Sequence, residues 1–300
     1  MTKISAVISA FNEEKNITDC IKSVANLADE IIVIDNESSD KTAEIAKKYG
    51  AKLFSKPNNL MLNINKNFGF SKANNDWIFN LDADERSTPE LDCEIKQTVN
   101  SNKQDNGYWI PRKNIIFGKW IKHSIWWPDE QLRLFRNGKG KFQNKHIHEY
   151  LEVEGETGHL LNPIIHENYN SITQFLYKLD KIYTVNEAES FLNSGKEINW
   201  TDSLKWPLSD FLKTYFSEKG YKDGLHGLVL SILQAFYAEV TFAKIWEKQG
   251  FKEKEITPSE FFKISKSMLK EFNYWLATME IEDTKNPVRR LLLKIKRKII

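Results

Sequence analysis

The sequence is short of cysteine and of long apolar runs. Its two cysteines, Cys20 and Cys93, have no metal-ligand spacing, so neither a zinc site nor a disulfide framework is predicted. No stretch of about eighteen uninterrupted apolar residues exists, which argues against a membrane-spanning helix. The early apolar run in MTKISAVISAFNEE is followed by acids and predicts a strand rather than a signal peptide. These features favour a reducing, cytoplasmic environment.

An excess of charge of one sign is also lacking. The 43 Lys and Arg nearly balance the 41 Asp and Glu, so the net charge of +2 does not indicate a nucleic-acid partner. Residues 285–300 are an exception, because they hold seven Lys and Arg and no acid. Of the 300 residues, 41% are hydrophobic, which is enough for a large domain or for one domain with an appendage.

The first hundred residues alternate between strand and helix patterns. The expected strands are the mostly apolar runs ISAVISAF (4–11), EIIVIDN (30–36), AKLFSKP (51–57) and DWIFNLD (76–82). Helical spacing separates them, with Asn12 expected to cap the first helix and Thr88-Pro89 to start a later one. The order β-α-β-α-β-α-β predicts a Rossmann-like α/β fold with a mostly parallel central sheet and helices on both faces.

The pattern changes near residue 105. Residues 101–170 are rich in Trp, Gly, His and short strand-like runs, whereas residues 171–300 are expected to be helical. We therefore expect one α/β domain over 1–170, built from halves 1–100 and 101–170, followed by a helical C-terminal region over 171–300.

Acids follow the strand at 76–82. Asp82, Asp84 and Glu85 lie within four residues, and Asp35 ends an earlier strand. Parallel strands bring their carboxyl ends to one edge, where ligands of such sheets bind. The first turn, SAFNEEKN, lacks the glycines that would hold a bare diphosphate, so a divalent cation, Mn²⁺ or Mg²⁺, is expected to bridge the acids to a diphosphate. A solvated loop without a ligand is the alternative.

Several segments carry a family resemblance. SAVISAFNEEKNITDCIKSV, DEIIVIDNESSDKTAEIAKKYGAK and IFNLDADE resemble the nucleotide-sugar half of family 2 glycosyltransferases, which have the GT-A fold. KWIKHSIWWPDEQLRLFRNGKGKF, KHIHEYLEV and NPIIHENY resemble a branch that includes bacterial lipopolysaccharide-core β-glucosyltransferases. The resemblance covers residues 3 to about 250 and assigns the nucleotide sugar to 1–100 and the acceptor side to 101–170. The Gln-x-x-Arg-Trp signature of processive synthases is absent, which favours transfer of a single sugar.

The resemblance also implies roles in nucleotide binding. Phe11, Asn12 and Glu13 are expected to line the nucleotide pocket. Asp35 is expected to accept a hydrogen bond from the base, expected to be uracil; a simple strand-end cap is the alternative.

The same resemblance implies a metal site with the D-x-D motif. Asp82 and Asp84 are expected to hold the ribose and the metal, with Asp84 as the preferred direct ligand. His148, in NKHIHEY, matches the His-Glu of the branch and could complete the site, although a surface or core histidine is the alternative. His166, in IIHENY, is expected in the core or near the acceptor, and the sequence does not decide between them.

Sugar transfer also requires a general base for the acceptor hydroxyl. In WWPDEQLRLFR, Asp129 is the first choice and Glu130 the second, with a solvated loop pair as the alternative. Arg133 and Arg136 could bind the diphosphate or form structural ion pairs. No second carboxylate is evident for a covalent intermediate, which favours inversion.

Two C-terminal segments bear on membranes. The apolar segment 225–246 is interrupted by His226, Gln234 and Glu239, so a core helix is expected and a membrane-facing helix is the alternative. Residues 286–300, NPVRRLLLKIKRKII, combine an apolar face with basic residues, which suits an anionic membrane surface; a solvated tail is the alternative.

Together these features predict a metal-dependent, inverting glycosyltransferase. It would move one sugar from a nucleotide-diphosphate donor, expected to be a UDP-sugar, to a saccharide or lipid-linked acceptor in cell-surface glycan synthesis such as lipopolysaccharide biosynthesis. It would act in the cytoplasm, peripheral to the membrane. A nucleotidyltransferase is one alternative, although SAFNEEKN is neither glycine-rich nor basic. A non-catalytic sugar-binding or membrane-docking module is the other.

Overall fold

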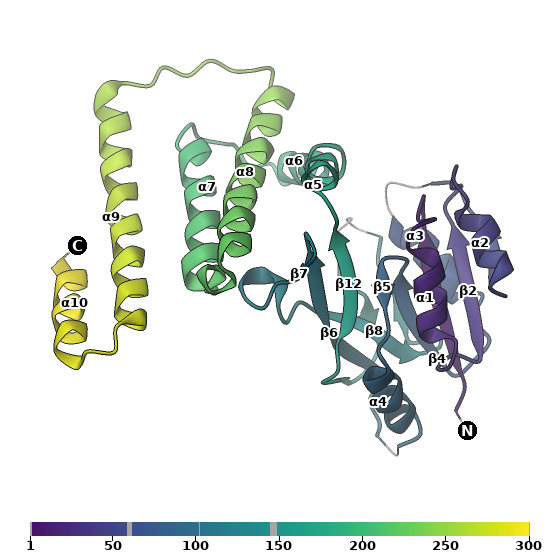
Figure 1. Ribbon diagram of the computed structural model, residues 1–300. Coiled ribbons are helices and arrows are strands. Elements are labelled where there is room, and N and C mark those ends of the chain that lie inside the picture. The colour runs from purple at the N-terminus through teal and green to yellow at the C-terminus, as the bar shows by residue number, and fades with distance from the viewer. Residues whose placement is uncertain (1, 59–61, 102, 145–148, 300) are drawn as a thin grey trace. The chain divides into compact units, whose positions relative to one another are not determined.

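The computed structural model divides the chain into an α/β unit and a helical unit (Figure 1). The structure describes residues 2–58, 62–101, 103–144 and 149–299. The α/β unit comprises Met1–Trp120 and Trp126–Asn170, and the helical unit comprises Ile121–Ile125 and Ser171–Ile300.

Strands β1 to β4 form the parallel part of the central sheet, in the order β3-β2-β1-β4. Their bounds are β1 Ile4–Ala10, β2 Glu30–Asp35, β3 Lys52–Ser55 and β4 Trp77–Asp82. Nearly every residue of β1, β2 and β4 is buried, which explains their almost continuous apolar runs. These strands therefore have both faces covered, as the sequence predicts.

Beyond β4 the sheet becomes mixed. The order continues β4-β8-β6-β12-β5, in which β8 is antiparallel to both neighbours and β6 is parallel to β12. The bounds in this sheet are β5 Glu85–Arg86, β6 Gly107–Ile116, β7 Lys119–Trp120, β8 Glu130–Arg136, β11 Thr157–His159 and β12 Ile164–Tyr169. Strands β9 Gly140–Lys141 and β10 Glu152–Val153 form a separate two-stranded sheet. The predicted α/β class is confirmed, but the sheet is mixed rather than mostly parallel, because β8 and β5 run antiparallel to their neighbours while β3-β2-β1-β4 and the β6–β12 pair are parallel.

Helices cover both faces of the sheet. They are α1 Ile17–Val24, α2 Thr42–Lys48, α3 Leu62–Phe70 and α4 Pro89–Val99. α1 and α4 share one hydrophobic cluster with Ile4, Ala6 and Ile8, whereas α3 packs in a second cluster with Val7. This alternation along β1 follows from the two-residue period of a strand.

Two helix starts test the expected caps. Thr88 accepts a hydrogen bond from Leu91 N, with Pro89 in the first turn of α4, as predicted. Asn12 does not cap α1, because that helix begins after Asn16 and Asn12 lies in the preceding turn with φ 54°. This turn therefore requires a left-handed backbone conformation at residue 12, which asparagine adopts more readily than most residues.

Glu30 anchors the edge of the sheet where the parallel strands begin. Its buried carboxylate accepts hydrogen bonds from Ser5 Oγ at 2.7 Å, Lys52 Nζ at 2.5 Å and Asn74 Nδ2 at 3.0 Å. Burial alone would raise the pKa of Glu30, but these donors lower it to about 2. Glu30 therefore stabilises the folded state above its unfolded pKa, and this stabilisation is lost as the pH falls toward about 2.

Glu30→Gln is expected to lower the free energy of unfolding by about 2 kcal/mol at neutral pH. The difference from the unsubstituted protein should shrink between about pH 4.5 and about pH 2, as the carboxylate protonates in both states. Urea denaturation at several pH values measures this, with the exposed Glu44→Gln as the control. A difference in unfolding free energy that stays constant down to about pH 2 would contradict the lowered pKa of Glu30.

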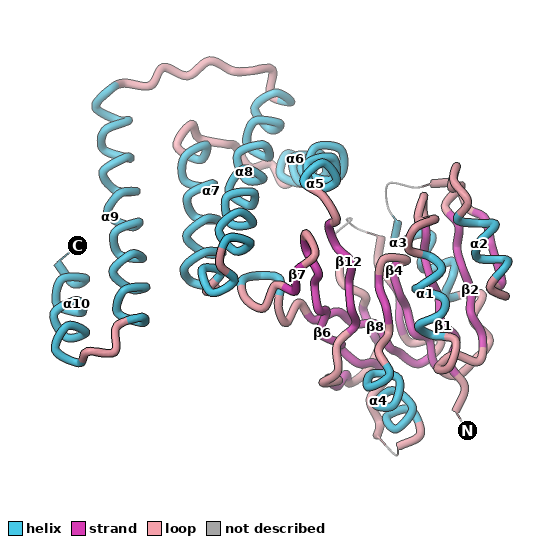
Figure 2. The backbone as a smooth tube through the Cα atoms, in the orientation of Figure 1, coloured by secondary structure: helices cyan, strands magenta, loops and turns pink. Residues whose placement is uncertain are grey.

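The helical unit contains every described residue beyond Asn170. Figure 2 shows this part of the chain as helices joined by loops. Its α-helices are α5 Ile172–Lys178, α6 Thr184–Asn193, α7 Asp202–Phe211, α8 Leu225–Lys248, α9 Pro258–Asp283 and α10 Pro287–Ile299. Short π-helices at Leu179–Tyr183 and Leu212–Ser217 continue α5 and α7, and a 3-10 turn at Gly220–Asp223 precedes α8.

Helix α8 is the one helix in the described ranges that is long and apolar enough to cross a membrane by length and composition. Core helices of soluble proteins meet the same criteria, and α8 packs against α7 and α6. Its polar side chains also face protein partners, since Gln234 bonds to Asp210 and Glu239 bonds to Ser203. These contacts cover one side of α8, but only 28% of its apolar window is buried, so the expected core position stays a prediction.

Candidate active site

The carboxyl ends of β1, β2 and β4 meet at one edge of the sheet. In the strand register, Asp35 lies opposite Ala10, and Asp82 lies opposite Ser9. Asp35 is buried, and its two carboxylate oxygens lie 3.3 and 3.4 Å from Ser38 N. The structure therefore brings Asp35 and Asp82 to the same edge, as expected from chain direction.

The turn after β1 is fastened to the turn after β2. Asn12 N donates to Ser38 Oγ at 2.9 Å, and Glu13 N donates to Thr42 Oγ1 at 2.8 Å. The Phe11 ring is 40% exposed, which leaves an aromatic surface beside this turn. A base or ribose could contact that surface.

Basic side chains of the protein balance two of the clustered acids. Asp82 lies 2.5 Å from Lys66 Nζ and 2.6 Å from the Arg133 guanidinium. Glu85 is fully buried and contacts Arg133 at 2.6 Å and Arg112 at 3.3 Å. Burial would raise the pKa of Asp82, but Arg133 and Lys66 hold it well below the usual range. The sequence predicts a divalent cation beside these acids, whereas the structure shows that Lys66, Arg112 and Arg133 supply much of the positive charge around them.

The two arginines proposed as diphosphate ligands lie in different places. Arg133 is buried and bonds the acids described above. Arg136 pairs in register with Trp77 and stacks on its ring at 4.7 Å. Trp77 and Asp82 are the two ends of β4, about 16 Å apart at the usual rise per residue. Because β8 runs antiparallel to β4, Arg136 lies beside the start of β4, whereas Asp82 and the clustered acids lie at its carboxyl end.

Asp84 faces His166. The Asp84 Oδ2 to His166 Nε2 distance is 3.5 Å, and both side chains are largely buried, with exposed fractions of 15% and 10%. Strand pairing holds them together: His166 lies opposite Glu85 in the register of β12 with β5, and Glu167 N donates to Asp84 O at 2.9 Å. The sequence left His166 undecided, and no local pattern reveals this pairing.

Asp129 is held by several donors at the start of β8. Arg112 donates to Asp129 Oδ2 through Nε at 3.0 Å, and its NH2 lies 2.8 Å from the same oxygen. Asn114 Nδ2 donates to that oxygen at 2.8 Å, and Gln131 Nε2 donates to Oδ1 at 3.1 Å. Because Arg112 also contacts Glu85, it joins Asp129 to the acid cluster. The sequence analysis missed Arg112 and Asn114, which lie on β6, far from any recognised motif.

The remaining candidates lie outside this cluster or outside the described residues. Glu130 is 38% exposed and contacts His159 Nδ1 at 2.9 Å, whereas Asp129 contacts Arg112 and Asn114. The two adjacent acids thus have separate surroundings. His148 falls outside the described residues.

The arrangement could hold a divalent cation with few protein ligands. Within the described ranges, no group of three or more His, Cys, Asp or Glu side chains is placed to hold a metal. A carboxylate oxygen of Asp84 and an imidazole nitrogen of His166 nevertheless lie 3.5 Å apart, close enough for one cation to contact both. Mg²⁺ and Mn²⁺ sites often use one or two protein carboxylates and complete their coordination with substrate phosphates and water. The Asp84–His166 pair fits such a site.

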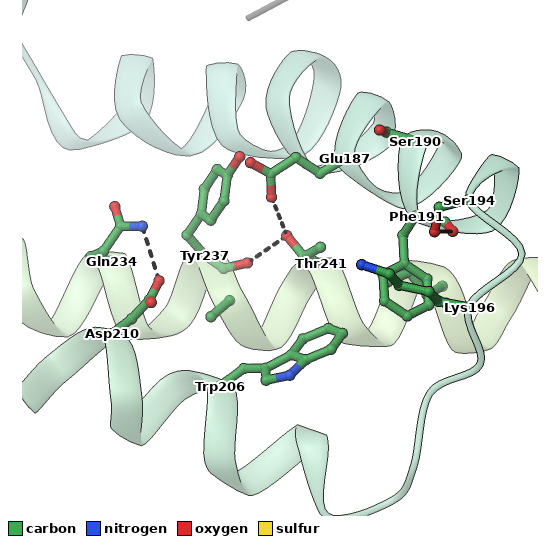
Figure 3. Close-up of a pocket in the computed structure, with 12 residues that line it drawn as sticks. Glu187, Ser190, Phe191, Ser194, Lys196, Trp206, Asp210, Gln234, Tyr237 and Thr241 are labelled. Carbon is green, nitrogen blue, oxygen red and sulfur yellow. Dashed lines mark hydrogen bonds between the residues drawn. The ribbon is translucent and has the colours of Figure 1, made fainter. Parts of the chain in front are cut away.

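A cavity of about 490 Å³ lies between α6, α7 and α8 of the helical unit (Figure 3). Its polar side chains bond within the cavity wall: Gln234 donates to Asp210 at 3.1 Å, and Thr241 Oγ1 lies 3.4 Å from Glu187. None of the clustered acids of the α/β unit lines it. It is therefore separate from the candidate site.

The chain is similar in sequence to known glycosyltransferases. Residues 5–152 match the family model "Glycosyl transferase family 2". The chain is 33% identical over 270 residues to an uncharacterized glycosyltransferase of Rickettsia typhi, covering 82% of this chain and 88% of that one. It is 27% identical over 256 residues to the lipopolysaccharide core biosynthesis glycosyltransferase LpsC of Rhizobium meliloti, covering 83% and 94%.

Solved structures show weaker similarity. S. aureus TarS 1-349 in complex with UDP is 15% identical with a TM-score of 0.45, covering 85% of this chain and 94% of that one. Glucosyl-3-phosphoglycerate synthase from Mycobacterium tuberculosis, in complex with Mn²⁺ and UDP-glucose, is 22% identical with a TM-score of 0.32. That match covers 38% of this chain and 44% of the synthase.

Proposed function

Because the chain belongs to glycosyl transferase family 2, we propose that it moves one sugar from a UDP-sugar to a saccharide or lipid-linked acceptor. The observation that carries this proposal is the convergence of Asp35, Asp84 with His166, and Asp129 around the carboxyl edge of one sheet. The relative from Rhizobium meliloti is named for lipopolysaccharide core biosynthesis, which supports an acceptor in cell-surface glycan synthesis.

Asp129 is the proposed general base. It would take the proton of the acceptor hydroxyl as that oxygen attacks the anomeric carbon of the donor sugar. The bond from that carbon to the diphosphate oxygen breaks in the same step, and the nucleoside diphosphate leaves. A single displacement of this kind inverts the anomeric configuration. Arg112 and Asn114 orient the carboxylate for this task.

Asp84 and His166 are the proposed protein ligands of the cation, Mn²⁺ or Mg²⁺. When bound, such a cation supplies Lewis-acid stabilisation of the departing diphosphate. Both oxygens of Asp82 already contact Lys66 and Arg133, so we assign Asp82 to the ribose rather than to direct ligation. His148 stays a predicted additional ligand.

The nucleotide is assigned to the turns that follow β1 and β2. The exposed ring of Phe11 would contact the base, and Asn12 and Glu13 would line the pocket beside it. The carboxylate of Asp35 would accept an N–H of uracil, because its contacts with Ser38 are long.

A thermal-shift screen tests the proposal. UDP-glucose, UDP-galactose and UDP-N-acetylglucosamine are each added with and without Mn²⁺, and UTP serves as the nucleotidyltransferase arm. At a concentration 100-fold above Kd, a ligand should stabilise the fold by about 2.7 kcal/mol. Stabilisation by one UDP-sugar that requires Mn²⁺ supports the proposal. Stabilisation by UTP alone, or none by any UDP-sugar, would contradict it.

A membrane role for α10 is part of the proposal. Val288, Leu291, Leu292 and Ile295 are each at least half exposed along this helix. Its basic side chains suit an anionic surface, so we propose peripheral contact with the cytoplasmic face of the membrane. Flotation with phosphatidylglycerol vesicles tests this, and equal binding of a Leu291→Ser, Leu292→Ser variant would contradict it.

A further inference from the structure

Asn114 links the two parts of the candidate site. It lies on β6 and is fully buried. Its Nδ2 donates to Asp129 Oδ2 at 2.8 Å and to Trp126 O at 2.8 Å, while its Oδ1 lies 2.6 Å from His166 Nδ1. A chain of contacts therefore runs from Asp129 through Asn114 and His166 to Asp84.

The partners of Asn114 fix which way its amide points. The Trp126 carbonyl and the Asp129 carboxylate can only accept hydrogen bonds, so the group between them must be the NH₂. The carbonyl oxygen of the amide then faces the His166 ring. Because that oxygen cannot donate, His166 Nδ1 must carry the hydrogen.

The hydrogen on His166 Nδ1 determines whether the other ring nitrogen, Nε2, donates or accepts toward Asp84. In a neutral imidazole, one nitrogen donates and the other accepts. With Nδ1 protonated, Nε2 directs its lone pair toward Asp84 Oδ2, 3.5 Å away. Two acceptors that face each other repel unless a proton or a metal cation lies between them, and a carboxylate oxygen is a ligand that Mn²⁺ favours. The tautomer that Asn114 imposes is thus the one that a metal ligand needs.

We propose that Asn114 is a positioning residue that holds His166 as a cation ligand and Asp129 as the base through the two ends of one amide. The proposal rests on the proposed function and adds a physical link between cation binding and base orientation. Asn168 Nδ2 also approaches Asn114 Oδ1, but at 3.4 Å, so it contributes little to this arrangement.

The tautomer can be measured in the unsubstituted protein without donor or acceptor. The protein has six histidines, so ¹⁵N-histidine NMR can resolve each ring, and His166→Gln assigns the relevant signals. In its neutral form, His166 is expected to show a protonated Nδ1 and an unprotonated Nε2. A protonated Nε2 would overturn the proposal whether or not the chain transfers a sugar.

Two substitutions distinguish the carbonyl of the Asn114 amide, which faces His166, from its NH₂ group, which faces Asp129. Asn114→Ala removes the carbonyl and the NH₂ group together, so the Mn²⁺ Kd from electron paramagnetic resonance should rise roughly 10- to 100-fold. Asn114→Asp keeps an acceptor for His166 Nδ1 but loses both donors. It should bind Mn²⁺ at least as tightly as the unsubstituted protein, while its kcat for transfer falls roughly 10- to 100-fold.

Asn168→Ala is the matched control, since it removes a neighbouring buried amide. Its Nδ2 lies 3.4 Å from Asn114 Oδ1, which is long for a hydrogen bond, so Mn²⁺ binding and kcat should stay within about threefold of the unsubstituted protein. The variants are compared only where their thermal unfolding midpoints show a folded chain, and the tautomer measurement decides the question if Asn114→Ala does not fold. Unchanged Mn²⁺ affinity in Asn114→Ala, or equal loss in Asn114→Ala and Asn114→Asp, would overturn the proposal.

Discussion

Asp129→Asn is expected to lower the rate of sugar transfer by roughly 10²- to 10⁴-fold while leaving donor binding unchanged. The amide cannot accept the proton of the attacking hydroxyl, but it keeps nearly the same shape. Its oxygen can still accept from Arg112, so the surrounding network should persist. Transfer rate and donor Kd, measured on the same preparation, test both parts of this expectation.

Glu130→Gln is the matched control for Asp129→Asn. It makes the same change of charge one residue further along the chain, but Glu130 is partly exposed and contacts His159 instead of the acid cluster. Its transfer rate should stay within a few-fold of that of the unsubstituted protein. A large loss in Glu130→Gln with a small loss in Asp129→Asn would reverse the two assignments.

Asp84→Asn should remove the Mn²⁺-dependent part of the stabilisation by UDP-sugar. The substitution takes away the Asp84 carboxylate, which faces His166, and a neutral amide is a much weaker ligand for a hard cation. At ligand concentrations that stabilise the unsubstituted protein by about 2.7 kcal/mol, the shift should fall close to zero. Transfer should fall with it, because the leaving diphosphate loses its stabilisation.

His166→Gln should behave like Asp84→Asn, whereas His159→Gln should resemble the unsubstituted protein. His159 is more than half exposed and contacts Glu130, away from Asp84. Calorimetry with Mn²⁺ and UDP compares the three variants directly. Full retention of Mn²⁺-dependent binding by both Asp84→Asn and His166→Gln would remove this pair from the metal site.

The sequence was most informative where structure is local. The apolar runs and helical spacing of the first hundred residues correctly predict β1, β2 and β4, and chain direction alone places Asp35 and Asp82 at one edge. The match to the glycosyl transferase family confirms the resemblance carried by those segments. These features depend on neighbouring residues and on general rules of parallel sheets.

The rest of the site depends on pairings between distant strands. Arg112 and Asn114 reach Asp129 because β6 pairs with β8, and His166 reaches Asp84 because β12 pairs with β5. No periodicity in the sequence specifies these partners. The same limit explains Arg136, which is three residues from Arg133 but lies toward the opposite edge because β8 runs antiparallel to β4.

The cations that surround Asp82 and Glu85 bear on how the enzyme can be handled. Lys66, Arg112 and Arg133 pair with these acids within the fold, so Asp82 and Glu85 do not need a metal to offset their mutual repulsion. If the proposed cation is required for transfer, a chelator should therefore abolish transfer without unfolding the chain, unlike its effect on small domains built around structural zinc. Purification in the presence of a chelator, followed by reconstitution with a chosen ion, becomes a practical route to comparing manganese with magnesium.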